Sequence, residues 1–95
     1  MRKITNNMPL AIIYPKSQSN IYIPTQLDGT LSKTVFEASH INASSTIYWH
    51  LDEQYLGQTI DIHQIELVPT EGKHVLTLVD DMGFEITRSF NVLGE

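Results

Sequence analysis

The sequence has no cysteine, and this absence removes several kinds of chemistry at once. Its 95 residues cannot form a disulfide, a zinc–thiolate site or a thiol nucleophile. Because many proteins of oxidising compartments also lack cysteine, this absence does not indicate the cellular compartment. Lysine and arginine are few as well, at six against eleven acidic residues, for a formal net charge of −5. A nucleic-acid-binding surface needs clustered basic side chains, so we expect no nucleic acid partner.

Long apolar runs are also missing. No stretch approaches the roughly 20 apolar residues that cross a membrane, so we expect no direct membrane insertion. The beginning of the chain, MRKITNNMPLAII, has neither the apolar core nor the small-residue cleavage site of a signal peptide. We therefore expect that the chain works outside the cytoplasm only as part of a larger exported protein. No window of about eleven or more residues follows the helical period, which favours an all-β fold.

The stretch that organises the chain is TIYWHLDEQYLG, residues 46–57, which contains the only tryptophan. Its first arm alternates with a period of two, which is typical of a half-buried strand. The face that contains Trp49 should be buried, and the face that contains Tyr48 and His50 should point outward. Residues 52–53 then form the turn of a hairpin that holds Trp49 in the core.

The rest of the chain divides into short β-rich runs separated by turns. We assign residues 1–8 to a linker or disordered N-terminal extension and residues 9–95 to a single domain. Two runs stopped by proline, Leu10–Pro15 and Ile21–Ile23, suit an edge strand that switches from one sheet to another. Further alternating runs follow at 34–39, 46–51, 58–69, 74–80 and 84–92. This spacing predicts a small immunoglobulin-like or fibronectin-type antiparallel β-sandwich of about seven strands.

Three positions match the core of such a sandwich. Immunoglobulin-like folds pack a tryptophan of strand C against inward residues of strands B and F. In this chain those residues are Trp49, Phe36 and Leu76, and a Phe36–Leu76 contact replaces the usual disulfide. His74 precedes Leu76 by two positions, which is the spacing of a tyrosine corner. We therefore predict that His74 is a structural histidine, hydrogen-bonded beneath a turn.

Four segments, taken in order, match a known family. They are IIYP (12–15), IYIP (21–24), IYWHLDEQYLG (47–57) and PTEGKHVLTLVDDMGFEITRSFNV (69–92). Their order and spacing resemble the C-terminal domain of bifunctional, class A penicillin-binding proteins of the C type, over nearly the whole chain. Two residues depart from that pattern: Glu53 stands where glycine is usual, and Leu78 replaces a valine.

The resemblance implies a bacterial, periplasmic module that is itself non-catalytic. Its parent would be an inner-membrane-anchored peptidoglycan glycosyltransferase and transpeptidase, whose enzyme motifs do not occur in these 95 residues. The expected function is to position the enzyme or to dock a partner, either a periplasmic protein or the parent's own catalytic domains. The alternative is a carbohydrate-binding module for peptidoglycan glycan strands. We expect no cofactor.

Histidines and carboxylates are the residue types here that can bind a metal or form an acid–base pair. The histidines are His40, His50, His63 and His74. No two of them have the close spacing that places imidazoles on one face, so we predict no metal site. The acidic pairs at 52–53 and 80–81 lie in predicted turns, and we interpret both as solvated. Neither Gly-x-Ser-x-Gly nor Ser-x-x-Lys is present, which argues against a hydrolase.

Outward aromatic residues are the feature that best suggests recognition. Tyr48 and His50 project from the outward face of their strand, and Tyr55 lies on a predicted edge. Together with Asp52, they are our candidate binding residues. The alternative is that they are ordinary surface residues, because aromatic residues favour strands in any case. The edges expected to accept a partner's strand are Ile21–Ile23 and the arm that contains Tyr55.

Overall fold

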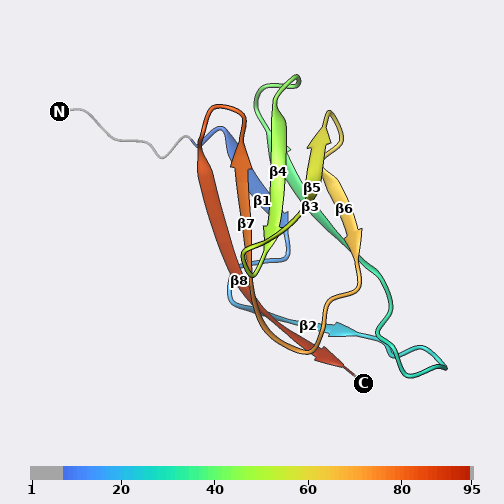
Figure 1. Cartoon of the computed structure of the whole chain (residues 1–95). Helices are drawn as coiled ribbons and strands as arrows, with labels where there is room; N and C mark the ends of the chain where they lie inside the picture. The colour runs from blue at the N-terminus through green and yellow to red at the C-terminus, as the bar shows by residue number, and fades with distance from the viewer. Residues whose placement is uncertain (1–7, 95) are drawn as a thin grey trace.

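The computed structural model describes residues 8–94, which form eight β-strands in two sheets (Figure 1). Most of the predicted linker, residues 1–7, lies outside the described residues. The strands are β1 (Leu10–Tyr14), β2 (Ser19–Ile23), β3 (Thr34–His40), β4 (Thr46–Leu51), β5 (Gln54–Ile60), β6 (Gln64–Leu67), β7 (Gly72–Asp80) and β8 (Glu85–Gly94). The described residues include no helix with the length and apolarity of a membrane-spanning segment.

The two sheets form the layers of a sandwich, which confirms the predicted fold. One sheet has the order β1-β3-β6, and the other has the order β2-β8-β7-β4-β5. All strand pairs are antiparallel except β2 and β8, which run parallel. The five-stranded sheet therefore ends in two open edges, β2 and β5, and these are the two edges that the sequence predicts.

The run after Gly57 is split into two strands by a tight turn. Asp61 has a positive φ of 69°, and the N–H of Ile62 donates to the carbonyl oxygen of Ile60 at 2.8 Å. The chain therefore leaves β5 in the five-stranded sheet and enters β6 in the three-stranded sheet. This crossing accounts for the separate strand β6.

The N-terminal strand changes sheets after Tyr14, as its prolines predict. β1 pairs with β3 in one sheet, and β2 pairs with β8 in the other. At the crossing, the guanidinium of Arg88 in β8 donates to the carbonyl oxygens of Ile12 (3.3 Å) and Pro15 (2.9 Å). Arg88 thus links the two sheets, a role that the sequence pattern did not indicate.

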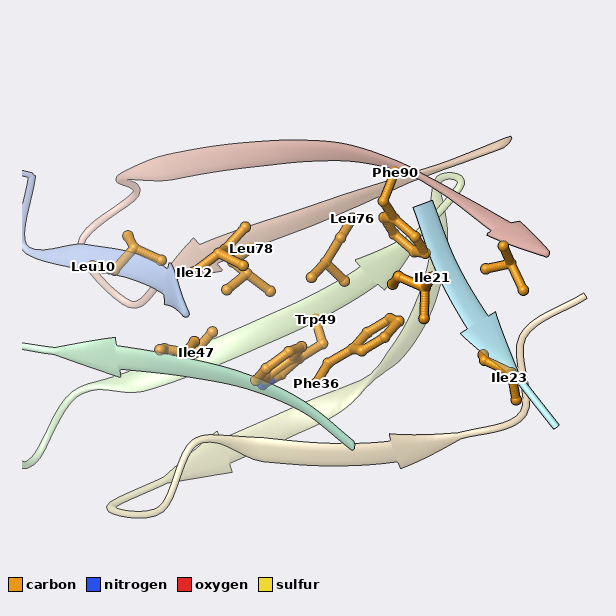
Figure 2. Packing of buried hydrophobic residues seen from close by; sticks show 12 residues of the cluster. Leu10, Ile12, Ile21, Ile23, Phe36, Ile47, Trp49, Leu76, Leu78 and Phe90 are labelled. Atoms are coloured by element: carbon orange, nitrogen blue, oxygen red, sulfur yellow. The ribbon is translucent and has the colours of Figure 1, made fainter. Parts of the chain in front are cut away.

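The core lies between the sheets and is centred on Trp49. Trp49, Phe36 and Leu76 are each 0% exposed and belong to one buried apolar cluster (Figure 2). The rings of Phe36 and Phe90 meet edge to face, with centroids 5.3 Å apart, a favourable geometry for aromatic pairs. The indole N–H of Trp49 donates to Oγ1 of Thr59 at 2.9 Å, so its polar atom is satisfied inside the core.

The inward face of β7 follows the predicted alternation. His74, Leu76, Leu78 and Asp80 are all buried. Two of these four side chains are ionisable, and a buried ionisable group is stable only when hydrogen bonds replace its contacts with water. The partners of His74 and Asp80 therefore decide how the ends of β7 are held.

Candidate functional site

The outward face of the five-stranded sheet brings three predicted binding residues together. His50 and Tyr55 are opposite each other in the pairing of β4 with β5, and their ring centroids are 5.4 Å apart. Tyr48 lies two residues before His50 and so shares its face. Tyr55 is exposed, whereas Tyr48 and His50 are half-buried. We call Tyr48, His50 and Tyr55 the aromatic strip.

A β-bulge in the central hairpin puts Tyr55 on this face. Trp49 pairs with Gly57, but the next residue of β4, His50, pairs with Tyr55, so Leu56 is left without a partner of its own. Unbroken pairing would set Leu56 opposite His50 and turn Tyr55 toward the core. With the bulge, Leu56 packs against the core and Tyr55 points outward. The φ of 147° at Gly57 is one that glycine adopts readily.

The aromatic strip contains a polar atom that the protein does not satisfy. Within residues 8–94, Nδ1 of His50 is the one buried side-chain nitrogen or oxygen that lacks a hydrogen-bond partner. An unmade hydrogen bond of this kind costs about 1–3 kcal/mol. Departures from polar satisfaction concentrate at functional sites. This feature distinguishes the strip from an ordinary sheet surface.

Asp52 does not join the aromatic strip. Its Oδ1 accepts the backbone N–H of Val75 at 2.8 Å, and its Oδ2 lies 2.6 Å from Nδ1 of His74. Burial acts to raise the pKa of Asp52, but the hydrogen bonds from Val75 and His74 and the charge of the histidine outweigh it and lower the pKa. Asp52 is exposed, as the predicted solvated turn requires, and its carboxylate also fastens the β4–β5 turn to β7.

His74 stands where a tyrosine corner has its tyrosine, and its ring bonds in two directions. Nε2 donates to the carbonyl oxygen of Thr70 at 2.7 Å, and Nδ1 faces the carboxylate of Asp52. Both partners are oxygen atoms that can accept a hydrogen bond, so the ring is held from both sides. The ring also stacks on Phe90, with centroids 5.6 Å apart. These contacts make His74 a structural residue that joins the turn before β7 to the central hairpin.

Asp80 is buried, so the solvated interpretation of the 80–81 turn is wrong at this position. It is 3% exposed. Oδ1 accepts the backbone N–H groups of Met82 and Phe84 at 2.9 Å each, and Oδ2 lies 2.8 Å from Nε2 of His40. Burial acts to raise the pKa of Asp80, but the hydrogen bonds from His40, Phe84 and Met82 outweigh this effect. The net result is a lowered pKa. The carboxylate shapes the β7–β8 turn and ties it to the end of β3.

His63 is connected to the central tryptophan through Thr59. The Thr59 hydroxyl accepts the indole N–H of Trp49 and lies 2.7 Å from Nδ1 of His63. Burial, with a smaller contribution from His40, lowers the pKa of His63, and Asp61 partly opposes this. The ring is therefore neutral near pH 7.

The polar side chains of the described region hold the fold together. Among residues 8–94, no group of three or more His, Cys, Asp or Glu side chains is placed to hold a metal ion. The carboxylates of Asp52 and Asp80 are both committed to backbone N–H groups and a histidine. Ser45 donates to Asp81 instead of to a histidine.

A groove of about 470 Å³ lies over β2, β8 and β7. Asn91 stands between Asn20 and Lys73 in the strand register, and its Nδ2 donates to Oδ1 of Asn20 at 3.3 Å. Gln18 also lines the groove, has a φ of 54°, and is held by a hydrogen bond from its N–H to the carbonyl oxygen of Ser89. The groove offers carboxamides, hydroxyls and one ammonium. Sequence reasoning missed it because its residues come from three strands.

Comparison with known proteins identifies the family. The model of the penicillin-binding protein C-terminus family matches residues 2–90. The chain belongs to this family. The resemblance seen in the sequence is thereby confirmed over nearly the whole chain.

A solved structure supports the fold of this family member. The fibronectin(III)-like modules of Clostridium thermocellum CbhA are similar to it, with a TM-score of 0.63 and 16% sequence identity. The similarity covers 90% of this chain and 95% of that one. At this identity the likeness shows the fold alone. No curated protein matches the chain.

The central turn contains one strained feature. Asp52 and Glu53 have φ values of 51° and 70°, so both lie in the left-handed region that two-residue hairpin turns require. The resemblance noted in the sequence implies that glycine is usual at the position of Glu53. This family member thus keeps the turn geometry with a side chain that disfavours it.

Proposed function

We propose that this domain is a non-catalytic accessory module of a periplasmic peptidoglycan synthase, which it positions by docking a protein partner. Membership in the penicillin-binding protein C-terminus family supports this context. A small fibronectin-like sandwich is consistent with an accessory role. The parent supplies the glycosyltransferase and transpeptidase activities. The partner is a periplasmic protein or the parent's own catalytic domains.

The open edge of β5 is the observation that best supports docking. β5 pairs with β4 on one side and with no strand of the described residues on the other. Its sequence, QYLGQTI, has no charge and no proline, two devices that usually protect an edge. An extended segment can add to such an edge, with backbone hydrogen bonds giving affinity and side chains giving specificity. The bulge distorts the beginning of β5, so the regular stretch 57–60 is where addition would start.

The aromatic strip lies beside this edge and supplies side-chain contacts. Its rings offer large, rigid area with polar atoms at their ends, a combination that is common in interfaces. Two exposed carboxylates flank β5, with Glu53 before it and Asp61 after it. These charges favour a partner segment that contains basic residues.

Replacing Tyr48 and Tyr55 together by serine tests the proposal. The double variant should keep the circular dichroism of the wild type, because both side chains are outside the core. Capture of a protein from periplasmic extract by the immobilised domain should weaken at least about tenfold, or roughly 1.4 kcal/mol. Tyr22→Ser, on the opposite edge strand β2, is the matched control. Unchanged capture by the folded double variant, or the same loss in Tyr22→Ser, would contradict the assignment to β5.

The groove over β2, β8 and β7 favours a second candidate function, binding of peptidoglycan glycan strands. Carboxamides and hydroxyls are suited to the hydroxyl and acetamido groups of such glycans, and Lys73 is suited to a carboxylate. The lining residues include no acidic side chain. Sedimentation with purified peptidoglycan tests this candidate. Binding that Asn20→Ala and Asn91→Ala abolish, but the Tyr48 and Tyr55 replacements do not, would support a glycan over a protein partner.

A further inference from the structure

One end of the sandwich exposes large apolar side chains from three separate loops. We define the loop end as residues 41–45 between β3 and β4, 61–63 between β5 and β6, and 81–84 between β7 and β8. The strand directions bring these loops to the same end of the molecule (Figure 1). Exposed apolar residues that gather on one surface mark interaction sites. Those of the loop end are Ile41 (83% exposed), Ile62 (72%), Met82 (78%) and Phe84 (47%).

Hydrogen bonds hold these loops in place. The hydroxyl of Ser45 donates to the carboxylate of Asp81, which ties the first loop to the third. Asp80 accepts the N–H groups of Met82 and Phe84, the two residues that display the apolar side chains of the third loop. The exposed side chains are thus presented by a fixed framework, which lowers the entropy lost when a partner binds.

The charges at the loop end are all of one sign. Asp61 and Asp81 are the charged residues of the three loops, and Glu85 directly follows the third loop. The exposed lysines of the described residues, Lys16, Lys33 and Lys73, all lie outside the three loops. A second copy docked end to end would set carboxylates against carboxylates, and an anionic lipid surface would repel them. The complementary partner is a protein surface with an apolar centre and basic residues around it.

The polypeptide enters the sandwich at this same end. The N–H of Ile41 donates to the carbonyl oxygen of Pro9 at 2.9 Å, and the first residue of β1, Leu10, pairs with His40. The family is named for the C-terminus of penicillin-binding proteins. In a synthase of that kind, the catalytic part reaches the sandwich through Pro9. A surface tethered so close has a high effective concentration, and even a weak contact is then occupied.

We propose that the loop end packs against an apolar, basic-rimmed surface on the catalytic part of the parent synthase. This inference rests on the proposed function, because it takes the parent to be such an enzyme. The contact fixes the orientation of the sandwich on the enzyme. It leaves the β5 edge, at the side of the sheet, free to receive a separate protein.

Hydrogen exchange tests this contact by comparing the 95-residue chain alone with the whole parent synthase. We expect the backbone amides of the loop end to exchange at least about tenfold more slowly in the parent, because docking suppresses the local opening that exchange requires. The triple replacement Ile41→Ser, Ile62→Ser and Met82→Ser should remove that protection. Leu27→Ser is the matched control, because Leu27 is fully exposed and lies between β2 and β3, away from the loop end.

The replaced side chains are exposed, so the triple variant should unfold at the wild-type temperature. If it does not, Glu85→Lys gives a second test, which reverses a charge beside the loop end without touching the apolar residues or the residues that flank β5. Equal exchange in the two wild-type samples would overturn the inference. Protection that rises with the concentration of the isolated chain would also overturn it, in favour of self-association. Neither outcome affects the β5 test, so the proposed function stands or fails separately.

Discussion

Asp52 and His74 lie 2.6 Å apart, Oδ2 to Nδ1, and this contact joins the central hairpin to the turn before β7. Because Asp52 also accepts the N–H of Val75, the Asp52→Ala replacement leaves that amide and the His74 ring without their partner. We expect the free energy of unfolding to fall by about 1–3 kcal/mol, measured by urea denaturation. Glu85→Ala, which removes an exposed carboxylate, should leave the urea midpoint nearly unchanged. Equal losses in the two variants would show that the Asp52 contact is not structural.

Stability should also decline as the pH is lowered below 6.5. The pKa of His63 is lowered from 6.5 in the folded state, so the unfolded chain takes up a proton at this residue first. The stability contributed by neutral His63 is complete above the unfolded pKa and is lost progressively below it. Urea midpoints across this window should therefore fall less steeply for His63→Gln than for the wild type. Identical slopes would contradict the assignment to His63.

Trp49 should be the largest single contributor to the core. Its side chain is 0% exposed and is hydrogen-bonded to Thr59. Trp49→Ala should reduce the free energy of unfolding by about 3–5 kcal/mol, because it removes buried area and leaves a cavity. The fluorescence of the native domain provides a direct check, since a buried indole emits at shorter wavelength than free tryptophan. An emission maximum equal to that of free tryptophan would contradict this placement.

Glu53→Gly should stabilise the domain. Glu53 has a φ of 70°, where a side chain costs roughly 1–2 kcal/mol and glycine costs nothing. Part of that gain is offset by the greater freedom of glycine in the unfolded chain, so we expect an increase of about 0.5–1 kcal/mol. Glu53→Ala keeps a Cβ atom at this position and should bring no comparable gain. A destabilised glycine variant would show that the Glu53 side chain itself holds the turn.

Most of the fold follows from alternation, because burial in a sheet repeats every two residues. That rule located Trp49, Phe36 and Leu76 in the core. Together with the prolines, it also predicted the switch between sheets and the two open edges. These features depend on residues that are close in the sequence, so the pattern within each single strand was enough to predict them.

The features that the sequence did not reveal depend on contacts between distant segments. From the sequence alone, Asp80 resembles an ordinary turn carboxylate, because its partner His40 lies on another strand. Arg88 resembles an ordinary strand residue in the sequence, because the carbonyl oxygens that it binds belong to the distant residues Ile12 and Pro15. Among the candidate binding residues, Asp52 is separated from the aromatic strip by its bond to His74. Local pattern gives the face of each residue and not its partner across the sandwich.

Removing the domain from its parent enzyme tests the central claim most directly. The measurement is the rate of glycan polymerisation and cross-linking by the purified parent synthase, with and without residues 9–95. If the domain is an accessory module, both rates should remain within about tenfold of the intact enzyme, since loss of one catalytic group typically costs about a hundredfold or more. The isolated domain should hydrolyse no peptidoglycan. A fall of several orders of magnitude in either rate, from a truncated enzyme that is still folded, would contradict the claim that the domain is non-catalytic.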